Sequence, residues 1–208
     1  MTGIAGETVI GLEEYLEGGP RRRVIDAAAA LFRKRGFNAV SMTEVAQAVG
    51  LSKPGLYHHW PGKEALLLAI VGITSELLLR QLEDSRRAPG DPAARMRAFM
   101  RSRLEVVAQY QDLFTVTWQE RAILSSAGFA RLASAAERYR EGVRQLIDEA
   151  KSAGLIRADI DTHLLMLALD GMTGWAYFWY REEGALRPGQ IGDAFWDMLV
   201  QGVGGAPA

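Results

Sequence analysis

The chain has 208 residues and a formal net charge of −1, with 49% hydrophobic residues, 24% charged residues and no cysteine. This composition excludes a disordered or collagen-like chain, and the lack of cysteine excludes a disulfide framework, a thiolate metal site and a cysteine nucleophile. Residues 1–19 have neither a basic segment nor a continuous apolar run. They therefore differ from a secretory signal, and a soluble cytoplasmic protein is expected.

The charge is unevenly distributed along the chain. Residues 1–19 contain four Glu and no basic residue, whereas residues 20–64 contain eight Lys or Arg against three Asp or Glu. A basic segment therefore lies between an acidic leader and a nearly neutral remainder. This asymmetry indicates a polyanionic partner, although the run Arg21–Arg23 is also typical of a solvated helix start.

The apolar spacing is helical almost throughout, and no segment shows the alternation of a strand. Three helices are expected over residues 21–35, 41–49 and 52–60. The second begins at a capping box opened by Ser41, and Ser52 caps the third. Six further helices are expected over residues 63–82, 92–111, 113–124, 129–153, 162–181 and 188–203. The sequence thus predicts an all-α fold of about nine helices.

Residues 41–60 have the pattern of a helix-turn-helix, in which the second short helix can enter a DNA major groove. Helical hairpins are common, so this pattern alone is only moderately specific. Further matching positions lie within Ala27–Ile70, and these are Leu31-Phe32, Gly36-Phe37, Thr43-Glu44-Val45-Ala46, Gly50-Leu51-Ser52, Gly55-Leu56-Tyr57, Trp60 and Lys63-Glu64. In these positions the segment closely resembles the DNA-binding domain of the tetracycline-repressor (TetR) family, with Trp60 where Phe is usual.

The sequence divides into four segments. Residues 1–19 are an acidic leader that we expect to be disordered, with folding back on the basic segment in the absence of DNA as the alternative, and residues 204–208 are a frayed tail. Residues 20–66 are expected to form the helix-turn-helix domain. Residues 67–203 are expected to form an effector-binding and dimerisation domain.

The resemblance also places a recognition helix after Ser52. It implies DNA contacts from Thr43, Ser52, Lys53, Pro54, Gly55, Tyr57, His58 and Lys63. Helix starts present free amides to phosphates, and we expect Thr43, Tyr57 and Lys63 to bind phosphates as well. Pro54 offers an apolar face to a thymine methyl group, and Gly55 lets the backbone approach closely.

Several of these residues have simpler interpretations. Tyr57 could be a core aromatic, and Lys63 could be a solvated amine. His58 and His59 could be metal ligands. Adjacent helical side chains point about 100° apart, however, and no carboxylate or cysteine accompanies this pair, so no metal site is expected.

A single helix-turn-helix makes too few base contacts, so a homodimer is expected. Residues 164–180 are apolar on nearly every face, and residues 188–203 form an amphipathic pattern. We expect these helices to form half of a four-helix dimer interface through Leu165, Leu169, Trp179, Ile191, Phe195 and Met198. An intramolecular core helix is the main alternative. A membrane span is disfavoured, because residues 164–180 are short for one and contain Asp170.

Aromatic and arginine side chains in the remaining helices could surround an effector pocket, although such spacing is also typical of a core. The candidates are Phe99, Arg103, Trp118, Arg121, Met172 and Trp175. The run from Trp175 to Gly184 is similar to TetR-type regulators of fatty-acid and sterol breakdown. That similarity implies an acyl-CoA thioester or another lipid-derived effector.

The predicted function is a dimeric repressor that releases its DNA operator when a small molecule binds. A helical partner-binding module and a small enzyme are the alternatives. Enzyme motifs such as GxSxG, HExxH and a Walker loop are missing. Asp159, Asp161 and His163 form a carboxylate–histidine cluster that a helix start explains better, with Asp161 as the cap. No cofactor is expected.

Overall fold

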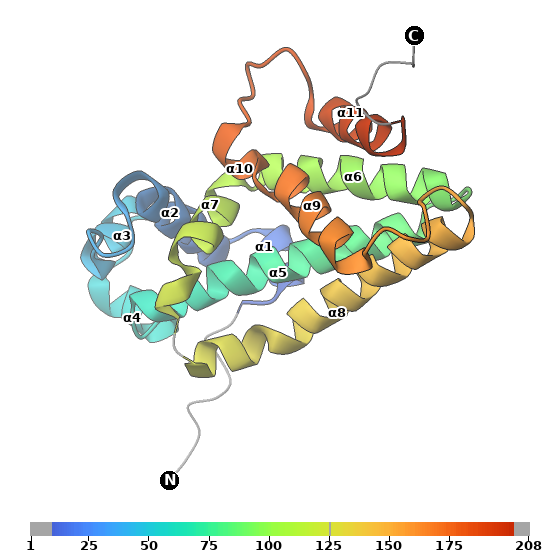
Figure 1. Cartoon of the computed structure of the whole chain (residues 1–208). Helices are drawn as coiled ribbons and strands as arrows, with labels where there is room; N and C mark the ends of the chain where they lie inside the picture. Colours follow the sequence, from blue (N-terminus) through green and yellow to red (C-terminus); the bar gives the residue numbers. More distant parts are fainter. Residues whose placement is uncertain (1–9, 125, 202–208) are drawn as a thin grey trace. The chain divides into compact units, whose positions relative to one another are not determined.

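A computed structural model describes residues 10–124 and 126–201 (Figure 1). These residues form eleven α-helices and one 3-10 helix, and no strand occurs among them. The predicted all-α fold is confirmed. The structure has two more α-helices than the expected nine. One is α1 (Leu12–Glu17), which lies before the first expected helix. The other arises because residues 162–181 form two helices, α9 (Thr162–Gly174) and α10 (Ala176–Trp179).

The chain divides into two compact units, each made from two segments of sequence. The first unit comprises residues 1–77 and 110–135, and the second comprises residues 78–109 and 136–208. Two helices, α5 (Lys63–Arg87) and α8 (Ser126–Ser152), contribute residues to both units. The boundary expected between residues 66 and 67 falls within α5, and a separately folding head domain stays a prediction.

The first unit is built around α2 (Pro20–Arg35). Pro20 lies in the first turn, where its missing N–H leaves no hydrogen bond unmade. One face of the helix is buried through Val24, Ile25, Ala28, Ala29 and Phe32. The helix ends at Gly36, whose φ of 81° favours glycine. Helix α7 (Gln111–Glu120) packs along α2 and is followed by the 3-10 helix η1 (Arg121–Ile123).

The described part of the acidic leader is ordered, in contrast to the expected disorder. In α1, Leu12 and Tyr15 are buried. The Tyr15 hydroxyl donates to Asp26 Oδ1 at 2.6 Å, and the Leu12 N–H donates to Glu76 Oε2 at 2.8 Å. These contacts, together with the Arg21–Glu14 ion pair at 3.0 Å, agree with the alternative that the leader folds back on the basic segment. Residues 1–9 and the expected frayed tail at 204–208 lie outside the described residues.

The second unit contains α6 (Pro92–Gln109), α9, α10 and α11 (Pro188–Gln201), with the remaining parts of α5 and α8. Its core draws side chains from five helices. The buried members are Leu82, Met96, Phe99, Met100, Val143, Leu146, Ile147, Ala150, Leu169 and Trp196. Leu169 therefore fits the intramolecular alternative to a dimer interface, and Phe99 fits the core alternative to an effector pocket.

Helix α11 lies along α6 at very short range (Figure 1). A Cβ atom added to Gly192 would lie 2.7 Å from both Arg101 Cα and Met100 O, so a side chain at this position would overlap the α6 backbone. Ion pairs flank the contact, and these include Arg97–Asp193 at 3.2 Å and Arg97–Asp197 at 2.6 Å. Glycine therefore permits the contact, and charged pairs border it.

Helix α5 is the one helix among the described residues with the length and apolar composition of a membrane span, and 72% of its apolar window is buried within the protein. Burial of this kind is typical of a core helix. Residues 164–180 do not form one continuous helix, since α9 has 13 residues and α10 has four. Each is shorter than the roughly 20 residues that span a bilayer.

Candidate nucleic-acid interface

The first helix of the predicted helix-turn-helix is α3 (Met42–Ala48), and it begins at the expected capping box. The Ser41 hydroxyl accepts from the Glu44 N–H at 3.2 Å, and Glu44 Oε2 accepts from the Ser41 N–H at 2.8 Å. Met42, Val45 and Ala46 are buried. With that face fixed, Thr43 is left exposed in the first turn.

The second helix is α4 (Lys53–His59), capped by Ser52, whose hydroxyl accepts from the Gly55 N–H at 3.2 Å. Leu56 and Trp60 anchor it, since both are fully buried. The opposite face is exposed and carries Lys53, Pro54, Tyr57, His58 and His59. This pattern leaves a polar and aromatic face available to a partner.

Tyr57 is 41% exposed, so it is not the core aromatic that the simpler interpretation required. The Lys53 ammonium lies 5.8 Å from the centre of its ring. Gly55 also has an intramolecular reason to be glycine, because an added Cβ would lie 3.2 Å from the Ser52 hydroxyl oxygen. A side chain at residue 55 would therefore crowd the cap of α4.

Lys63 begins α5 and contacts the turn that follows α2. Its ammonium donates to the carbonyl oxygens of Phe37 at 2.8 Å and Asn38 at 3.3 Å, and it lies 4.7 Å from the centre of the Phe37 ring. The sequence did not indicate this structural contact. The Lys63–phosphate contact stays a prediction.

Four of the eight basic residues between positions 20 and 64 form ion pairs with carboxylates. The pairs are Arg21–Glu14 at 3.0 Å, Arg22–Asp26 at 3.3 Å, Arg35–Glu44 at 2.5 Å and Arg33–Asp112. Exposed pairs contribute at most about 1 kcal/mol each, but a phosphate must displace the carboxylate before any of these arginines can neutralise it. Arg21 also lies 5.5 Å from the centre of the Trp60 ring, a neighbour that no local sequence signal predicted.

The Glu44 cap makes the stability of α3 depend on acid pH. Hydrogen bonds from the Ser41 backbone N–H and from Arg35 lower the pKa of Glu44 to about 2 from an ordinary value of 4.5. Since the folded pKa is the lower one, the stabilisation is complete above the unfolded value and is lost as pH falls towards 2. Glu44→Gln is therefore expected to reduce the loss of unfolding free energy that accompanies a fall in pH from about 4.5 to about 2.

Urea unfolding followed by circular dichroism, repeated between about pH 2 and pH 6, measures that change. Glu182→Gln, which alters an exposed carboxylate in a turn, serves as the control. An equal loss of unfolding free energy at acid pH in the wild type and in Glu44→Gln would contradict this role of Glu44.

The rings of His58 and His59 lie 5.0 Å apart. Across the part of the chain that the structure describes, no group of three or more His, Cys, Asp or Glu side chains could hold a metal ion. At the start of α9, the Asp161 carboxylate accepts from the Leu164 N–H at 2.8 Å, as expected of a cap.

The residues expected to bind an effector do not share one compact unit. Phe99 and Arg103 are buried in the second unit, where Met172 is half-buried and Trp175 is 53% exposed. Trp118, 40% exposed, belongs to the first unit together with Arg121. The structure therefore does not bring all six together within one unit.

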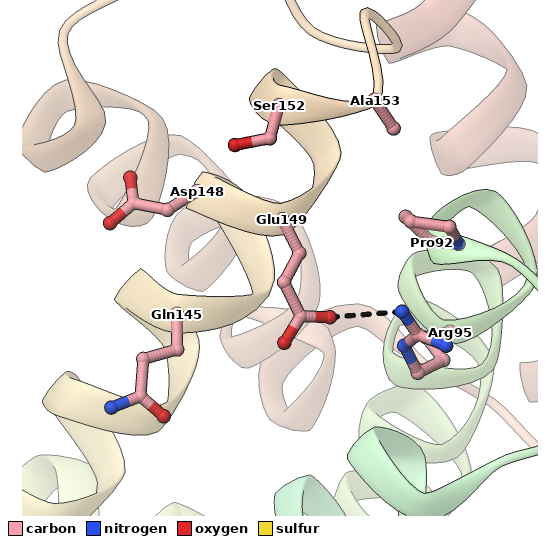
Figure 2. Close-up of a pocket in the computed structure, with 7 residues that line it drawn as sticks. All are labelled: Pro92, Arg95, Gln145, Asp148, Glu149, Ser152 and Ala153. Carbon is pink, nitrogen blue, oxygen red and sulfur yellow. Dashed lines mark hydrogen bonds and ion pairs between the residues drawn. The ribbon is translucent and has the colours of Figure 1, made fainter.

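A hollow of about 620 Å³ lies on the second unit between α6 and α8 (Figure 2). Most of the residues that line it are polar or charged, and they include an Arg95–Glu149 ion pair at 3.0 Å. None of the six expected effector residues lines it.

The expected dimer residues are divided between core and surface. Leu169 is buried, Leu165, Ile191 and Phe195 are half-buried, and Trp179 and Met198 are exposed. Further apolar residues of α9, α10 and α11 are exposed, namely Leu164, Leu167, Trp175, Phe178 and Val200. We name the exposed set of Leu164, Leu167, Trp175, Phe178, Trp179, Met198 and Val200 the apolar face.

Comparison with known families covers both parts of the chain. Residues 24–70 match the family described as bacterial regulatory proteins, tetR family. Residues 89–203 match the family described as tetracyclin repressor-like, C-terminal domain. The second match alone spans more than half of the chain.

Individual relatives agree along nearly their whole length. The repressor KstR2 of Mycobacterium tuberculosis is 22% identical over 185 residues, which cover 88% of this chain and 92% of the relative. The solved TetR family regulator PfmR of Thermus thermophilus is 28% identical, with a TM-score of 0.81 over 88% of this chain and 99% of that chain. The structure of AibR in complex with isovaleryl coenzyme A and operator DNA is 30% identical, with a TM-score of 0.77 over 88% and 98%.

These matches confirm the resemblance found in the sequence, and they exclude the enzyme alternative because the matched family consists of transcriptional regulators. The chain belongs to the TetR family and is a cytoplasmic DNA-binding transcriptional regulator.

Proposed function

We propose that the protein is a homodimeric repressor that places α4 of each protomer in a DNA major groove and leaves its operator when a small molecule binds. The exposed face of α4 is the observation that carries the proposal. Leu56 and Trp60 hold the helix on the domain, while Lys53, Tyr57 and His58 remain free of the core.

The chemistry of this face suits a nucleic acid. Lys53 supplies charge for phosphates, and the Tyr57 hydroxyl can donate to a phosphate oxygen. Pro54 presents an apolar surface to a thymine methyl group. The exposed Thr43 hydroxyl in the first turn of α3 supplies another donor.

The apolar face supports a second copy of the chain as the partner. Leu164, Phe178 and Met198 are 64%, 59% and 40% exposed, respectively. Large apolar side chains exposed on three successive helices indicate a protein interface where they gather into one surface. Two-fold pairing of these helices would also supply the second reading helix that a helix-turn-helix protein needs.

Two relatives support the repressor role and the acyl-CoA effector class. KstR2 is named as a repressor, and the AibR structure holds both isovaleryl coenzyme A and operator DNA. Together with the similarity of residues 175–184, these names make an acyl-CoA thioester the proposed effector class. Such a ligand shifts the protein away from operator only as far as it binds the released form more tightly.

Replacing Tyr57 tests the DNA-binding face. Tyr57→Ala is expected to weaken operator binding about tenfold or more, because it removes a phosphate donor and its stacking surface. Tyr57→Phe, which loses only the hydroxyl, should fall between the wild type and Tyr57→Ala. Fluorescence anisotropy on a genomic fragment retained by the wild-type protein measures the affinity.

Size-exclusion chromatography with light scattering provides the control, since both variants should keep the wild-type mass. Unchanged operator affinity in Tyr57→Ala would show that α4 does not form the DNA interface. Adding isovaleryl coenzyme A to the bound fragment then tests release, and continued binding of DNA with saturating thioester would contradict release by this ligand.

A further inference from the structure

Arg103 is the one charged residue that the structure buries within its described ranges, with 2% of its surface exposed. It lies on α6 one turn after Phe99, in the apolar core of the second unit. A guanidinium group stays protonated in proteins, and a buried charge requires a counter-ion and hydrogen bonds. The cost of burying Arg103 therefore depends on how well its partners neutralise the guanidinium group.

Two side chains contact the guanidinium group. Its Nη1 donates to the Tyr139 hydroxyl at 2.8 Å, and the Tyr139 ring centre lies 5.3 Å from Arg103 Cζ. Its Nη2 donates to Asp170 Oδ1 at 3.3 Å. Among the described residues, no partner accepts from Nε, although this atom is buried.

The Arg103 Nε–H, which lacks a hydrogen-bond acceptor in the described part of the chain, lies on the edge of the guanidinium group that binds carboxylates. The Nε–H and one Nη–H of arginine lie parallel on one edge of the guanidinium plane, and this edge fits the two oxygens of a carboxylate. Asp170 contacts the guanidinium group through a single long bond. The Asp170 side chain is also 43% exposed, so water screens its charge. Arg103 is therefore only partly neutralised.

We propose that Arg103 binds the oxyanion of an amphipathic effector, which replaces Asp170 as the counter-ion. Phe99 and Leu169 belong to the core around this position, so the rest of the ligand is apolar. The inference rests on the proposed effector response and adds a chemical class, an apolar chain that ends in an oxyanion. A carboxylic acid and the phosphates of a coenzyme A thioester both supply this chemistry.

The exchange also gives the ligand a way to act on the dimer. Asp170 belongs to α9, the helix that contributes Leu164 and Leu167 to the apolar face. Displacing Asp170 removes an ion pair that ties α9 to Arg103 of α6. A ligand that takes the place of Asp170 thereby removes one of the contacts that hold α9 against α6.

The test compares three ten-carbon probes on the full-length protein: decanoate, decanoyl coenzyme A and the neutral decanamide. Titration calorimetry should show that an anionic probe binds at least about tenfold more tightly than decanamide, as expected for a charge-assisted bidentate contact. The anionic probe that binds identifies the source of the oxyanion. Equal binding of all three probes, or binding of none, would overturn the proposal.

Variants assign the effect to this cluster. Arg103→Gln should abolish the preference for the anionic probe, and Arg103→Lys should reduce it, because an ammonium group cannot form the two-point contact. Asp170→Asn removes the competing carboxylate and should raise anion affinity about tenfold. Since Asp170 is partly exposed, this variant also tests the proposal if Arg103→Gln does not fold.

Asp197→Asn is the matched control. Asp197 is likewise 43% exposed and pairs with an arginine of α6, yet its replacement should leave probe affinity unchanged. Wild-type affinity in Asp170→Asn would overturn the exchange. Operator binding in the same samples separates the two proposals: a probe that binds Arg103 without releasing DNA contradicts only the release function.

Discussion

Gly192→Ala is expected to lower the free energy of unfolding by about 3 kcal/mol. The added Cβ would lie 2.7 Å from the Met100 carbonyl oxygen and 2.8 Å from the Arg101 backbone nitrogen. Both atoms belong to the backbone of α6, so no side-chain rotation can relieve the overlap. Helix α11 must move away, and its buried Trp196 would lose contacts with the core.

Chemical unfolding followed by circular dichroism at a fixed protein concentration measures this loss. Gly72→Ala is the matched control, since Gly72 is also buried in a helix but an added Cβ would meet only Leu132 Cδ2 at 3.8 Å. That variant should be neutral or more stable by roughly 0.5 kcal/mol, because alanine favours the helix. Equal free energies of unfolding in the two variants would mean that α11 can move away from α6 without destabilising the protein.

Phe178→Asp is expected to raise the dissociation constant of the dimer on the order of a hundredfold. Phe178 is 59% exposed in one chain, so the aspartate stays hydrated in the monomer. In the proposed dimer the same carboxylate would be buried without a partner. Analytical ultracentrifugation over a range of concentrations measures the shift, and operator affinity should fall with it.

The half-buried Phe195, predicted from the sequence as an interface residue, gives a second test through Phe195→Asp, which should also dissociate the dimer. Ile123→Asp controls for the charge change, because Ile123 is a 40% exposed apolar residue outside α9, α10 and α11. A Phe178→Asp protein that remains dimeric at low concentration would exclude the apolar face as the interface.

Helix ends were the most predictable part of the fold, because their chemistry is local. Ser41 and Ser52 cap the helices expected from the sequence, and Gly36 ends α2 with a positive φ. Each signal depends on residues within one turn of chain. The exposed face of α4 was predictable for the same reason, since the short helix can bury only the side that carries Leu56.

Long-range contacts were not predictable from these patterns. The order of α1 depends on Tyr15 reaching Asp26 and on the Leu12 N–H reaching Glu76. The sequence showed that residues 164–180 are apolar on nearly every face, but it could not show which side faces the core. In the structure Leu169 is 1% exposed and Leu167 is 54% exposed, a distinction that only the packing of α9 on α6 decides.

The effector candidates are divided between the two units for a related reason. Aromatic spacing shows that a residue lies on a helix face, but it does not show which unit the helix joins. Trp118 and Trp175 both fit the pattern, yet they belong to different units. Arg103 stood out only when its burial and its incomplete set of partners were known.

The pairing of basic residues with carboxylates near the helix-turn-helix limits how many counterions the protein can release from DNA. Each phosphate that a cation neutralises adds about 0.9 to the slope of log affinity against log salt. Arg21 can contribute only if Glu14 gives way to a phosphate, and Arg35 only if Glu44 does. For each protomer, the slope of log affinity against log salt should therefore be well below the slope expected if all eight basic residues neutralised phosphates. Glu14→Gln, by removing the Glu14 carboxylate from Arg21, should steepen that slope.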